Sequence, residues 1–207
     1  MRTGIAIALV LLVNSAQAAQ IYSRPGTGFA TGATSIYIHG QIDPGDEKTF
    51  NAIAEQISNG QAVVVLSHSH GGDVLAAMNI GHTIQKKQFA TMLGKRTGDY
   101  CESACTLILL AGAHVTVEKG VLLGFHRPSV NGQENGFGDL LVMVYLNKIA
   151  GLNDKQIDYM MSAAPNDIHY AMPRDPWLLG FDPQVIVCPS SFCNWQSCQK
   201  RWCYITP

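Results

Sequence analysis

The sequence predicts an α/β protein built around a mainly parallel sheet. Between residues 35 and 125, short apolar, strand-like runs alternate with helical patterns. The run Ala62–Leu66 is unbroken and β-branched, which is typical of a strand buried on both faces of a sheet. Strands that alternate with helices imply crossover connections between parallel neighbours. The order of the elements and this one central strand therefore set the fold class.

The first segment of the chain has the pattern of a secretory signal peptide. Arg2 precedes an apolar run, Ile5–Val13, and a small-x-small cleavage pattern ends at Ala18. The run is shorter than the roughly 20 residues of a membrane span, and an uncleaved anchor is the alternative. We therefore expect residues 1–18 to be removed and the mature protein to be periplasmic or secreted.

Composition excludes several functions. The 207-residue chain has a formal net charge of −1, and no basic stripe points to a nucleic acid partner. The Gly71-Gly72 turn lacks the lysine of a phosphate-binding loop, so we expect no cofactor. His68 and His70 alternate along the chain and would point to opposite sides of an extended backbone, so we expect no metal site.

The elements follow from periodicity and stop signals. Residues 19–34 are rich in Gly, Ser, Thr and Pro, so we expect a lead-in loop. Asp46 could cap the first helix, and Asn59-Gly60 would end it. One domain would cover 35–187. The expected strands are Ser35–Gly40, Ala62–Leu66, Phe89–Leu93, Val115–Val117, Val121–Phe125 and Gln184–Val187, and the expected helices include Phe50–Ile57, Val74–Lys87, Thr106–Ala111, Asp139–Ala150, Asn153–Met161 and Pro173–Leu179.

The pentad Cys101–Cys105 (Cys-Glu-Ser-Ala-Cys) places a hydroxyl residue just before an apolar helix that ends at Gly112. At a helix N-terminus the backbone N–H groups are unpaired and the dipole favours negative charge. Ser103 could therefore cap the helix, or it could be a nucleophile that faces an oxyanion site. The pentad alone leaves both interpretations open.

Two further motifs bear on that choice. Gly71-Gly72 lies between a buried strand and a helix, where glycines leave backbone N–H groups uncovered. His126 follows the apolar strand Val121–Phe125, where it could be structural or could take a proton from a serine. The other histidines are also candidates for that base: His39, His68, His70, His82, His114 and His169.

In this order and context the three motifs resemble those of the Clp-type serine peptidases. Residues 69–74 (Ser-His-Gly-Gly-Asp-Val) are similar to the family's Ser-Pro-Gly-Gly-x-Val turn. Residues 103–104 (Ser-Ala) are similar to its nucleophile and the next residue, and 126–128 (His-Arg-Pro) to its His-x-Pro segment. The resemblance spans roughly 36–182, and it points to exported, stand-alone members that carry Cys-x-Ser-Ala-Cys.

The resemblance implies a ClpP/crotonase-like fold, a spiral of ββα units, followed here by a cysteine-rich tail. It implies an exported serine hydrolase, an ATP-independent peptidase whose substrate is a peptide or a protein. Ser103 would be the nucleophile and His126 the general base. The backbone N–H groups of Gly72 and Ala104 would form the oxyanion hole.

The resemblance also suggests the third member of a triad. The family takes an Asp from shortly before its final short helix and its Gly-Leu-x-Asp ending. Residues 180–182 (Gly-Phe-Asp) are similar to that ending and point back to Asp167. We prefer Asp167 to Asp158 or Asp175 as the carboxylate that would orient His126.

Three departures limit what the resemblance implies. His70 replaces the family's proline, so the glycine turn is less constrained by its own backbone. The segment from His126 to Asp167 is shorter than usual, so the family's ring assembly is in doubt and a homo-oligomer stays open. An exported chain has no ATP supply, so we expect no ATPase partner.

Six cysteines fit an oxidising compartment, where disulfides persist. Cys101 and Cys105 would brace Ser103 if they pair, but one turn of helix would need distortion to bring them within about 7 Å. The tail 188–207 holds four more at a spacing of five, and a hairpin would favour the outer pair together with the inner pair. A zinc knuckle is the alternative. The tail cysteines are Cys188, Cys193, Cys198 and Cys203.

Three other functions stay open. The same fold could serve as a catalytically inactive interaction module that uses the Cys- and Trp-rich tail. It could also carry another crotonase-type chemistry on acyl-CoA, although export disfavours a cytosolic substrate. A Ser–Lys dyad is a further variant, with Lys95 or Lys119 as the base.

Overall fold

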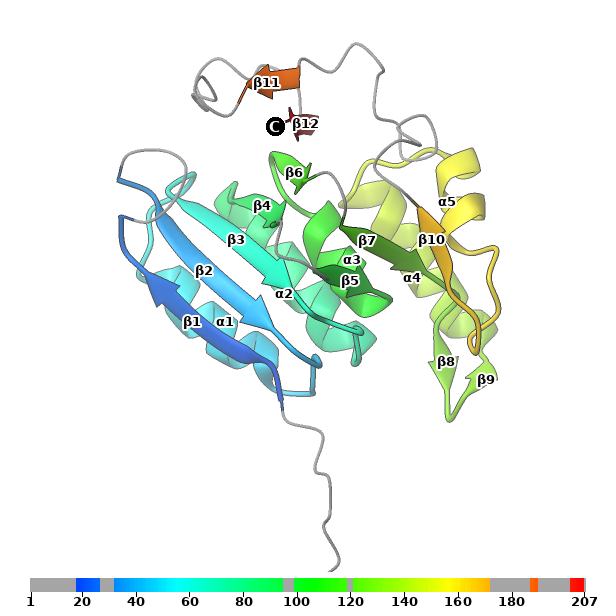
Figure 1. The fold of residues 1–207 in the computed structure, drawn as a ribbon. Helices are drawn as coiled ribbons and strands as arrows, with labels where there is room; N and C mark the ends of the chain where they lie inside the picture. Colours follow the sequence, from blue (N-terminus) through cyan, green and yellow to red (C-terminus); the bar gives the residue numbers. More distant parts are fainter. Residues whose placement is uncertain are drawn as a thin grey trace, which may run out of the picture.

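The computed structural model describes residues 18–26, 32–94, 99–118, 121–171, 187–189 and 202–206. Figure 1 shows strands and helices alternating along the chain, and most neighbouring strands are parallel. The predicted α/β class with a mainly parallel sheet is therefore confirmed. Within the described ranges, no helix is long and apolar enough to cross a membrane.

The larger sheet has seven strands among the described residues, and β1, at its edge, is antiparallel to β2. In spatial order the strands are β1 (Gln20–Arg24), β2 (Thr34–His39), β3 (Ala62–Ser67), β4 (Ala90–Leu93), β6 (Val115–Glu118), β12 (Trp202–Thr206) and β11 (Val187–Pro189).

A second sheet of three strands and a small hairpin complete the β structure of the described chain. The second sheet consists of β10 (His169–Ala171), β7 (Leu122–Phe125) and β5 (Tyr100–Glu102), and the hairpin of β8 (Ser129–Val130) and β9 (Gln133–Glu134). The helices are α1 (Asp46–Glu55), α2 (Val74–Lys87), α3 (Ala104–Leu110), α4 (Gly136–Lys148) and α5 (Asp154–Met160).

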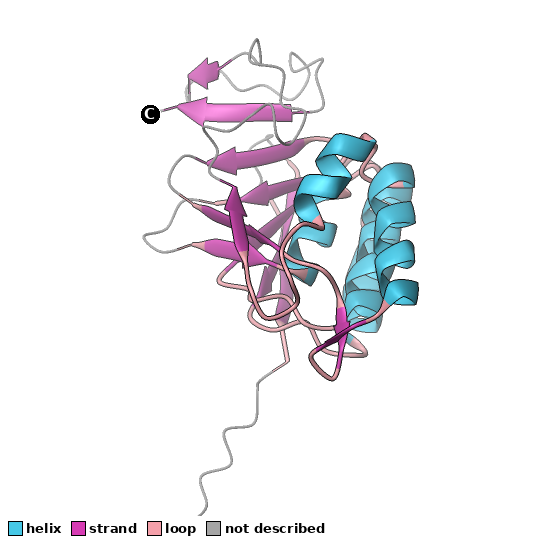
Figure 2. Cartoon of the chain, turned by 90° about the vertical axis from the view of Figure 1, so that its right-hand side faces the viewer, coloured by secondary structure: helices cyan, strands magenta, loops and turns pink. Residues whose placement is uncertain are grey.

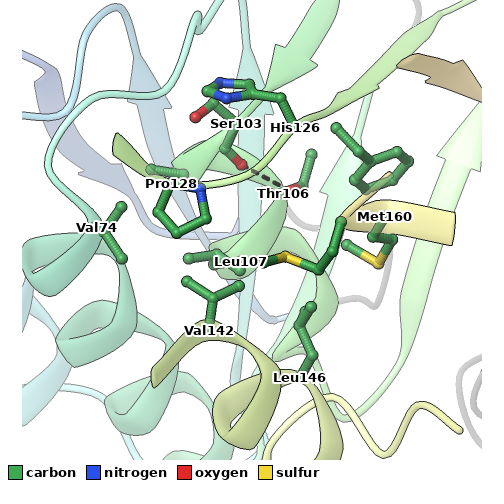
Figure 3. Close-up of a pocket in the computed structure, with 12 residues that line it drawn as sticks. Val74, Ser103, Thr106, Leu107, His126, Pro128, Val142, Leu146 and Met160 are labelled. Carbon is green, nitrogen blue, oxygen red and sulfur yellow. Dashed lines mark hydrogen bonds between the residues drawn. The ribbon is translucent and has the colours of Figure 1, made fainter. Parts of the chain in front are cut away.

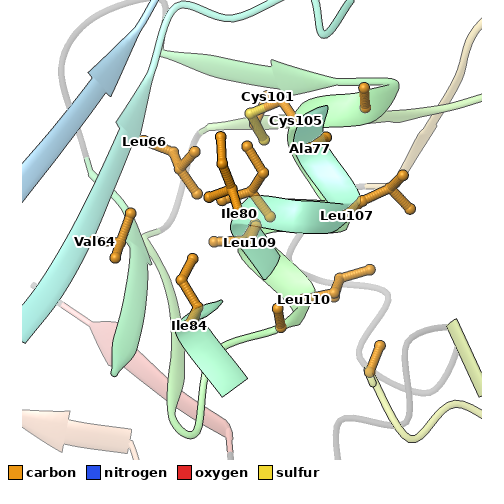
Figure 4. Packing of buried hydrophobic residues seen from close by; sticks show 14 of the residues in the cluster. Val64, Leu66, Ala77, Ile80, Ile84, Cys101, Cys105, Leu107, Leu109 and Leu110 are labelled. Atoms are coloured by element: carbon orange, nitrogen blue, oxygen red, sulfur yellow. A yellow bond between two sulfur atoms is a disulfide. The ribbon is translucent and has the colours of Figure 1, made fainter. Parts of the chain in front are cut away.

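The helices gather on one side of the strands, as Figure 2 shows. Helix α3 lies at the centre of the core, and all seven of its residues are buried. Figure 4 shows α3 packed beside α2, with Leu109 close to Ile80 and Ile84. A helix that is apolar all round is stable only when it is enclosed. The residue that precedes α3, Ser103, is thereby attached to a fully buried helix.

Helix α4 is anchored to this core through Tyr145. The Tyr145 hydroxyl donates a hydrogen bond of 3.0 Å to the carbonyl oxygen of Leu107 in α3. Gly81 of α2 makes room for it, because a Cβ there would lie 1.7 Å from the Tyr145 hydroxyl. Burial raises the pKa of Tyr145, so the phenol stays a neutral donor.

Two expectations at the start of the domain are wrong. Within the expected lead-in loop, Gln20–Arg24 forms β1, whose Ile21 packs against the core while most of the strand is exposed. An edge strand with one inward apolar residue gives little periodic signal. Asp46 is the first residue of α1 rather than its cap, and its carboxylate accepts hydrogen bonds from the N–H groups of Asp43 and Ala19.

The C-terminal expectations are tested only in part. Strands β11 and β12 are parallel, so the hairpin assumed for the tail cysteines is wrong for these two segments. The expected helix Pro173–Leu179 lies outside the described residues, as do residues 184–186 of the last expected strand. Strand β12 pairs with β6, so part of the tail belongs to the main sheet rather than to a separate appendage.

Candidate active site

The site forms where three parallel strands end. The chain leaves β3 at Ser67 and turns through Gly71-Gly72, it leaves β5 at Glu102, and it leaves β7 at Phe125. Strand β5 pairs with β7 in parallel, with Glu102 opposite Gly124. Because parallel strands end on the same edge of a sheet, Ser103 and His126 emerge side by side. An isolated bridge between Ser69 and Cys101 joins the glycine turn to the same edge.

Ser103 occupies a backbone conformation that side chains rarely adopt, with φ 52° and ψ −128°. Its N–H donates a hydrogen bond of 2.9 Å to the carbonyl of Gly124, and its own carbonyl accepts from the N–H and hydroxyl of Thr106. Its side chain makes no capping hydrogen bond to α3. The interpretation of Ser103 as a helix cap is therefore wrong, and a strained strand-to-helix turn presents its hydroxyl instead.

Gly71 lets the glycine turn press against this serine. Its φ is +86°, and a Cβ at this position would lie 2.7 Å from the Ser103 Cβ, the Ala104 nitrogen and the Glu102 carbonyl oxygen. Real Cβ atoms are not found so close to other atoms, so only glycine fits. The turn and the nucleophile candidate are thus in direct backbone contact.

The residues expected to form the oxyanion hole, Gly72 and Ala104, come directly after Gly71 and Ser103, which make this contact. Gly72 forms a bridge with Ile42 in which the Gly71 carbonyl accepts from Ile42 and the Asp73 N–H donates to Ile42. That pattern leaves the Gly72 N–H outside the bridge. Ala104 is the first residue of α3, where backbone N–H groups have no partner within the helix. The local backbone pairing on either side of the contact therefore does not use these two N–H groups.

A disulfide joins Cys101 and Cys105 across the serine, with Cα atoms 5.4 Å apart. Cys101 lies on β5 and Cys105 on α3, so the bridge spans a strand-to-helix turn and not a turn of helix. The expected distortion of a helix therefore does not arise. Both residues are fully buried.

His126 is half-buried, and its ring has a defined hydrogen bond. Nδ1 lies 2.7 Å from the carbonyl oxygen of Arg127, which can only accept, so Nδ1 carries the proton. In the neutral ring, Nε2 then holds the lone pair. This is the tautomer that a general base requires.

The Arg127 carbonyl is itself held in place. The Arg127 N–H donates a hydrogen bond of 3.1 Å to the carbonyl of Ala163. The guanidinium contacts Glu134 of β9 at 2.9 Å and Asp139 of α4 at 3.6 Å. The orientation of His126 therefore depends on the hairpin and on α4.

The carboxylate expected to orient His126 has a different hydrogen-bond partner. Asp167 is exposed, and its side chain accepts a hydrogen bond of 2.8 Å from the N–H of Ile168. Among the described residues, no carboxylate bonds to His126, and the Arg127 carbonyl takes that position. Asp158 is exposed on α5, and Asp175 lies outside the described residues.

A pocket opens beside Ser103, and His126 lies at the same end of it (Figure 3). No hydrogen bond joins the two side chains in the described structure, and unliganded active sites are commonly looser than their complexes. The rest of the lining is mostly apolar and includes Val74, Leu107, Phe125, Pro128, Val142 and Leu146.

The two histidines of the glycine turn pair with different carboxylates. His68 lies 3.0 Å from Asp99, and His70 lies 2.6 Å from Glu102. Within the described part of the chain, no group of three or more His, Cys, Asp or Glu side chains could hold a metal ion. The backbone is not extended here, since His68 has φ 47°, and both rings contact Tyr100, at centroid distances of 5.5 Å for His68 and 4.5 Å for His70.

Several candidates lie outside what the structure describes. Lys95 and Lys119, the alternative bases, are not among the described residues, and neither are Cys193 and Cys198. Cys188 and Cys203 lie on β11 and β12, where only the backbone is described. The pairing of the tail cysteines therefore stays a prediction.

The arrangement of strands and helices is a ClpP-like α/β fold with a mainly parallel sheet. Two solved structures that share it are those of the 1510-N membrane-bound stomatin-specific protease. A serine-to-alanine mutant has 22% sequence identity and a TM-score of 0.54, covering 72% of this chain and 76% of the other. A lysine-to-alanine mutant in complex with a substrate peptide has 23% identity and a TM-score of 0.53, covering 72% of each chain.

These similarities establish the shared fold. A scan against protein-family models finds no match, and a search of curated proteins finds no relative. The chemistry must therefore be argued from the residues of this chain.

Proposed function

We propose that this protein is an exported, ATP-independent serine peptidase. The observation that carries the proposal is the conformation of Ser103. A serine in a strained turn, which does not cap its helix and lies beside a histidine with Nε2 unprotonated, has the arrangement of an activated nucleophile. The two protease structures that share the fold support the same reaction class.

In the proposed reaction, the Ser103 hydroxyl attacks the carbonyl carbon of a scissile peptide bond while Nε2 of His126 takes its proton. The oxyanion accepts hydrogen bonds from the N–H groups of Gly72 and Ala104. His126 then gives the proton to the leaving amine, and water hydrolyses the acyl-enzyme by the same route. The carbonyl of Arg127 stabilises the protonated ring, and Asp167 stays a prediction as a third triad member.

The apolar pocket supports a peptide whose side chain beside the cleaved bond is uncharged. Leu107 and Val142 form part of its wall, and His126 is the one titratable residue among those that line it in the described chain. A charged side chain would lose its hydration there without a partner. We expect apolar residues to be preferred at this position of the substrate.

Export is part of the proposal and rests on sequence and chemistry together. The N-terminal pattern is that of a signal peptide, and residues 1–17 lie outside the described ones. The disulfide between Cys101 and Cys105 supports an oxidising compartment. Fractionation of the native host should place the protein, cleaved near Ala18, outside the cytoplasm.

A fluorophosphonate probe tests the proposed chemistry. We expect it to label the oxidised, full-length mature protein at Ser103, with labelling abolished in Ser103→Ala. Labelling should fall by about 10²–10⁴-fold in His126→Ala, the range for loss of a general base. Separate Lys95→Ala and Lys119→Ala variants are the controls, since a lysine base would show its effect there and not at His126.

Each result decides between the alternatives. Loss of labelling in a lysine variant, with His126→Ala unaffected, would replace the histidine by a Ser–Lys dyad. A folded protein that is not labelled would favour an interaction module on this fold. If the protein is labelled, cleavage of a peptide library by the wild-type protein tests the expected preference for an apolar side chain beside the cleaved bond.

A further inference from the structure

Glu102 is a charged residue buried directly before the proposed nucleophile, and the reaction above does not use it. Only 5% of its surface is exposed. A carboxylate in such a place is costly unless it is hydrogen-bonded. Both of its oxygens have partners: Oε2 lies 2.6 Å from Nδ1 of His70, and Oε1 accepts a bond of 2.7 Å from the Tyr170 hydroxyl.

His70 is satisfied on both sides of its ring. Nδ1 donates to Glu102, and Nε2 lies 3.0 Å from the hydroxyl of Tyr100, which can donate to it. A neutral ring with its proton on Nδ1 completes this chain of bonds. On the far side, the hydrogen bond to Glu102 raises the pKa of Tyr170, so the phenol remains a donor. Both ring nitrogens of His70 and both carboxylate oxygens of Glu102 therefore have a hydrogen-bond partner.

Both residues of this hydrogen bond directly precede groups that take part in the proposed reaction. His70 precedes Gly71-Gly72, which carries one proposed oxyanion donor. Glu102 precedes Ser103 and Ala104, the nucleophile and the other donor. The bond between His70 and Glu102 therefore links the glycine turn to the segment that carries Ser103. It is a second link, in addition to the backbone contact that Gly71 makes with Ser103.

Gly124 shows that this placement of Glu102 is built into the fold. A Cβ at Gly124 would lie 2.8 Å from Cγ of Glu102 and 2.7 Å from a methyl group of Ile168. The same glycine accepts the hydrogen bond from the Ser103 N–H. One residue of β7 thus makes room for the carboxylate and anchors the serine.

We propose that His70 and Glu102 are positioning residues whose hydrogen bond holds the Gly71-Gly72 turn against Ser103. This inference rests on the proposed function, since it assigns the bond the task of aiming the Gly72 N–H at the oxyanion. Clp-type peptidases have a proline where this chain has His70, and a proline fixes the turn through its own φ. Here a side-chain bond between the glycine turn and the last residue of β5 supplies the constraint. A misplacement of about 1 Å at a reacting centre can cost 10²-fold in rate.

The test compares variants that break the bond with variants that keep or replace the constraint. His70→Ala and Glu102→Leu break it, and His70 is exposed enough for the first to fold. Glu102→Gln keeps an oxygen that can accept the hydrogen bond from Nδ1 of His70. His70→Pro replaces the side-chain bond by a rigid backbone. A proline is compatible with this position because the His70 N–H takes no part in the neighbouring Ser69–Cys101 bridge. His39→Ala is the matched control, an exposed histidine that contacts Ser67 and lies outside the network.

We expect the rate of fluorophosphonate labelling at Ser103 to fall by about 10- to 100-fold in His70→Ala and Glu102→Leu. Glu102→Gln, His70→Pro and His39→Ala should stay within about threefold of the wild-type rate. The double variant of His70→Ala and Glu102→Leu should lose no more than the more damaged single variant, because the two residues act as one unit. A purely structural role would instead lower the urea midpoint of His70→Ala while the folded protein kept the wild-type labelling rate.

Amide hydrogen exchange separates failure of this inference from failure of the proposed function. In His70→Ala we expect exchange at Gly71 and Gly72 to speed up at least about tenfold, with α3 unaffected. If the wild-type protein is labelled but both breaking variants label normally, the positioning role is wrong and the peptidase stands. If the wild-type protein is not labelled, the peptidase is wrong, and unchanged exchange in His70→Ala would overturn the positioning role as well.

Discussion

Ser103 and His126 end neighbouring parallel strands, yet the chain holds them by different means. Ser103 is held by main-chain bonds to Gly124 and Thr106, by a buried disulfide, and by a glycine turn pressed against it. His126 is held by one hydrogen bond to the carbonyl of Arg127, whose side chain reaches an exposed hairpin.

The contrast separates a rigid half of the site from an adjustable half. Elements that form part of the core resist displacement, whereas surface ion pairs of the kind made by Arg127 contribute little stability. Changes on the serine side should therefore alter both stability and activity. Changes on the histidine side should alter activity alone.

The largest effect is expected where the serine half is most crowded. Gly71→Ala would place a Cβ 2.7 Å from the Ser103 Cβ and from two backbone atoms, at φ +86°. We expect a loss of about 3 kcal/mol or more in the free energy of unfolding, because overpacking and backbone strain add. Urea denaturation measures it, and labelling at Ser103 should be lost in parallel.

Gly60→Ala separates the two causes. Gly60 also has positive φ, at +71°, but a Cβ there would have nothing within 4 Å. It should cost only about 1–2 kcal/mol, the penalty for the left-handed conformation alone, and labelling should be unchanged. Equal losses in the two variants would show that the close approach of Gly71 to Ser103 has no energetic weight.

The disulfide should have an intermediate effect. Its cysteines are separated by 4 in sequence, so the loop is short, and the chain-entropy argument gives about 2 kcal/mol for a loop of about five residues. We expect the Cys101→Ala, Cys105→Ala double variant to lose about that much in urea denaturation. Its labelling should slow by less than about tenfold, because the main-chain bonds of Ser103 remain. A loss beyond a hundredfold in a folded variant would make the bridge the main support of the serine.

The smallest effect is expected at Asp167. Its carboxylate bonds to the N–H of Ile168, and the Arg127 carbonyl already accepts from His126. Asp167→Asn should therefore label within about threefold of the wild-type rate, and Asp158→Asn is the control at another exposed aspartate. A loss near the 10⁴-fold that follows removal of a triad carboxylate would restore Asp167 as the third member.

Residue type points to two side chains that the structure brings to one pocket, Ser103 and His126. Gly71, Ser103 and His126 are recognisable because their chemistry is rare and their spacing is informative. The partner of His126 was missed because it is a main-chain carbonyl, and any residue at position 127 could supply it. Glu102 was missed because a Glu before a helix suggests a favourable charge near the helix dipole. Its burial depends on Gly124 and Tyr170, which are distant in sequence.

The elements of the fold that the sequence predicts are likewise those whose own residues carry the signal. The unbroken run of β3 and the apolar face of α2 were correct because burial leaves a periodic signal. Asn153, where a helix was expected to begin, is the N-cap of α5 and forms a full capping box with Gln156. Strand β1 was missed because its pairing with β2 supplies what its own residues do not indicate.

The backbone of Ser103 also sets a conflict between stability and activity. A non-glycine residue at φ 52° and ψ −128° costs of order 1–3 kcal/mol, and the side chain recovers none of it by capping α3. Glycine would occupy this turn without strain. Selection for stability alone would therefore favour glycine at position 103. The presence of serine indicates a requirement other than folding.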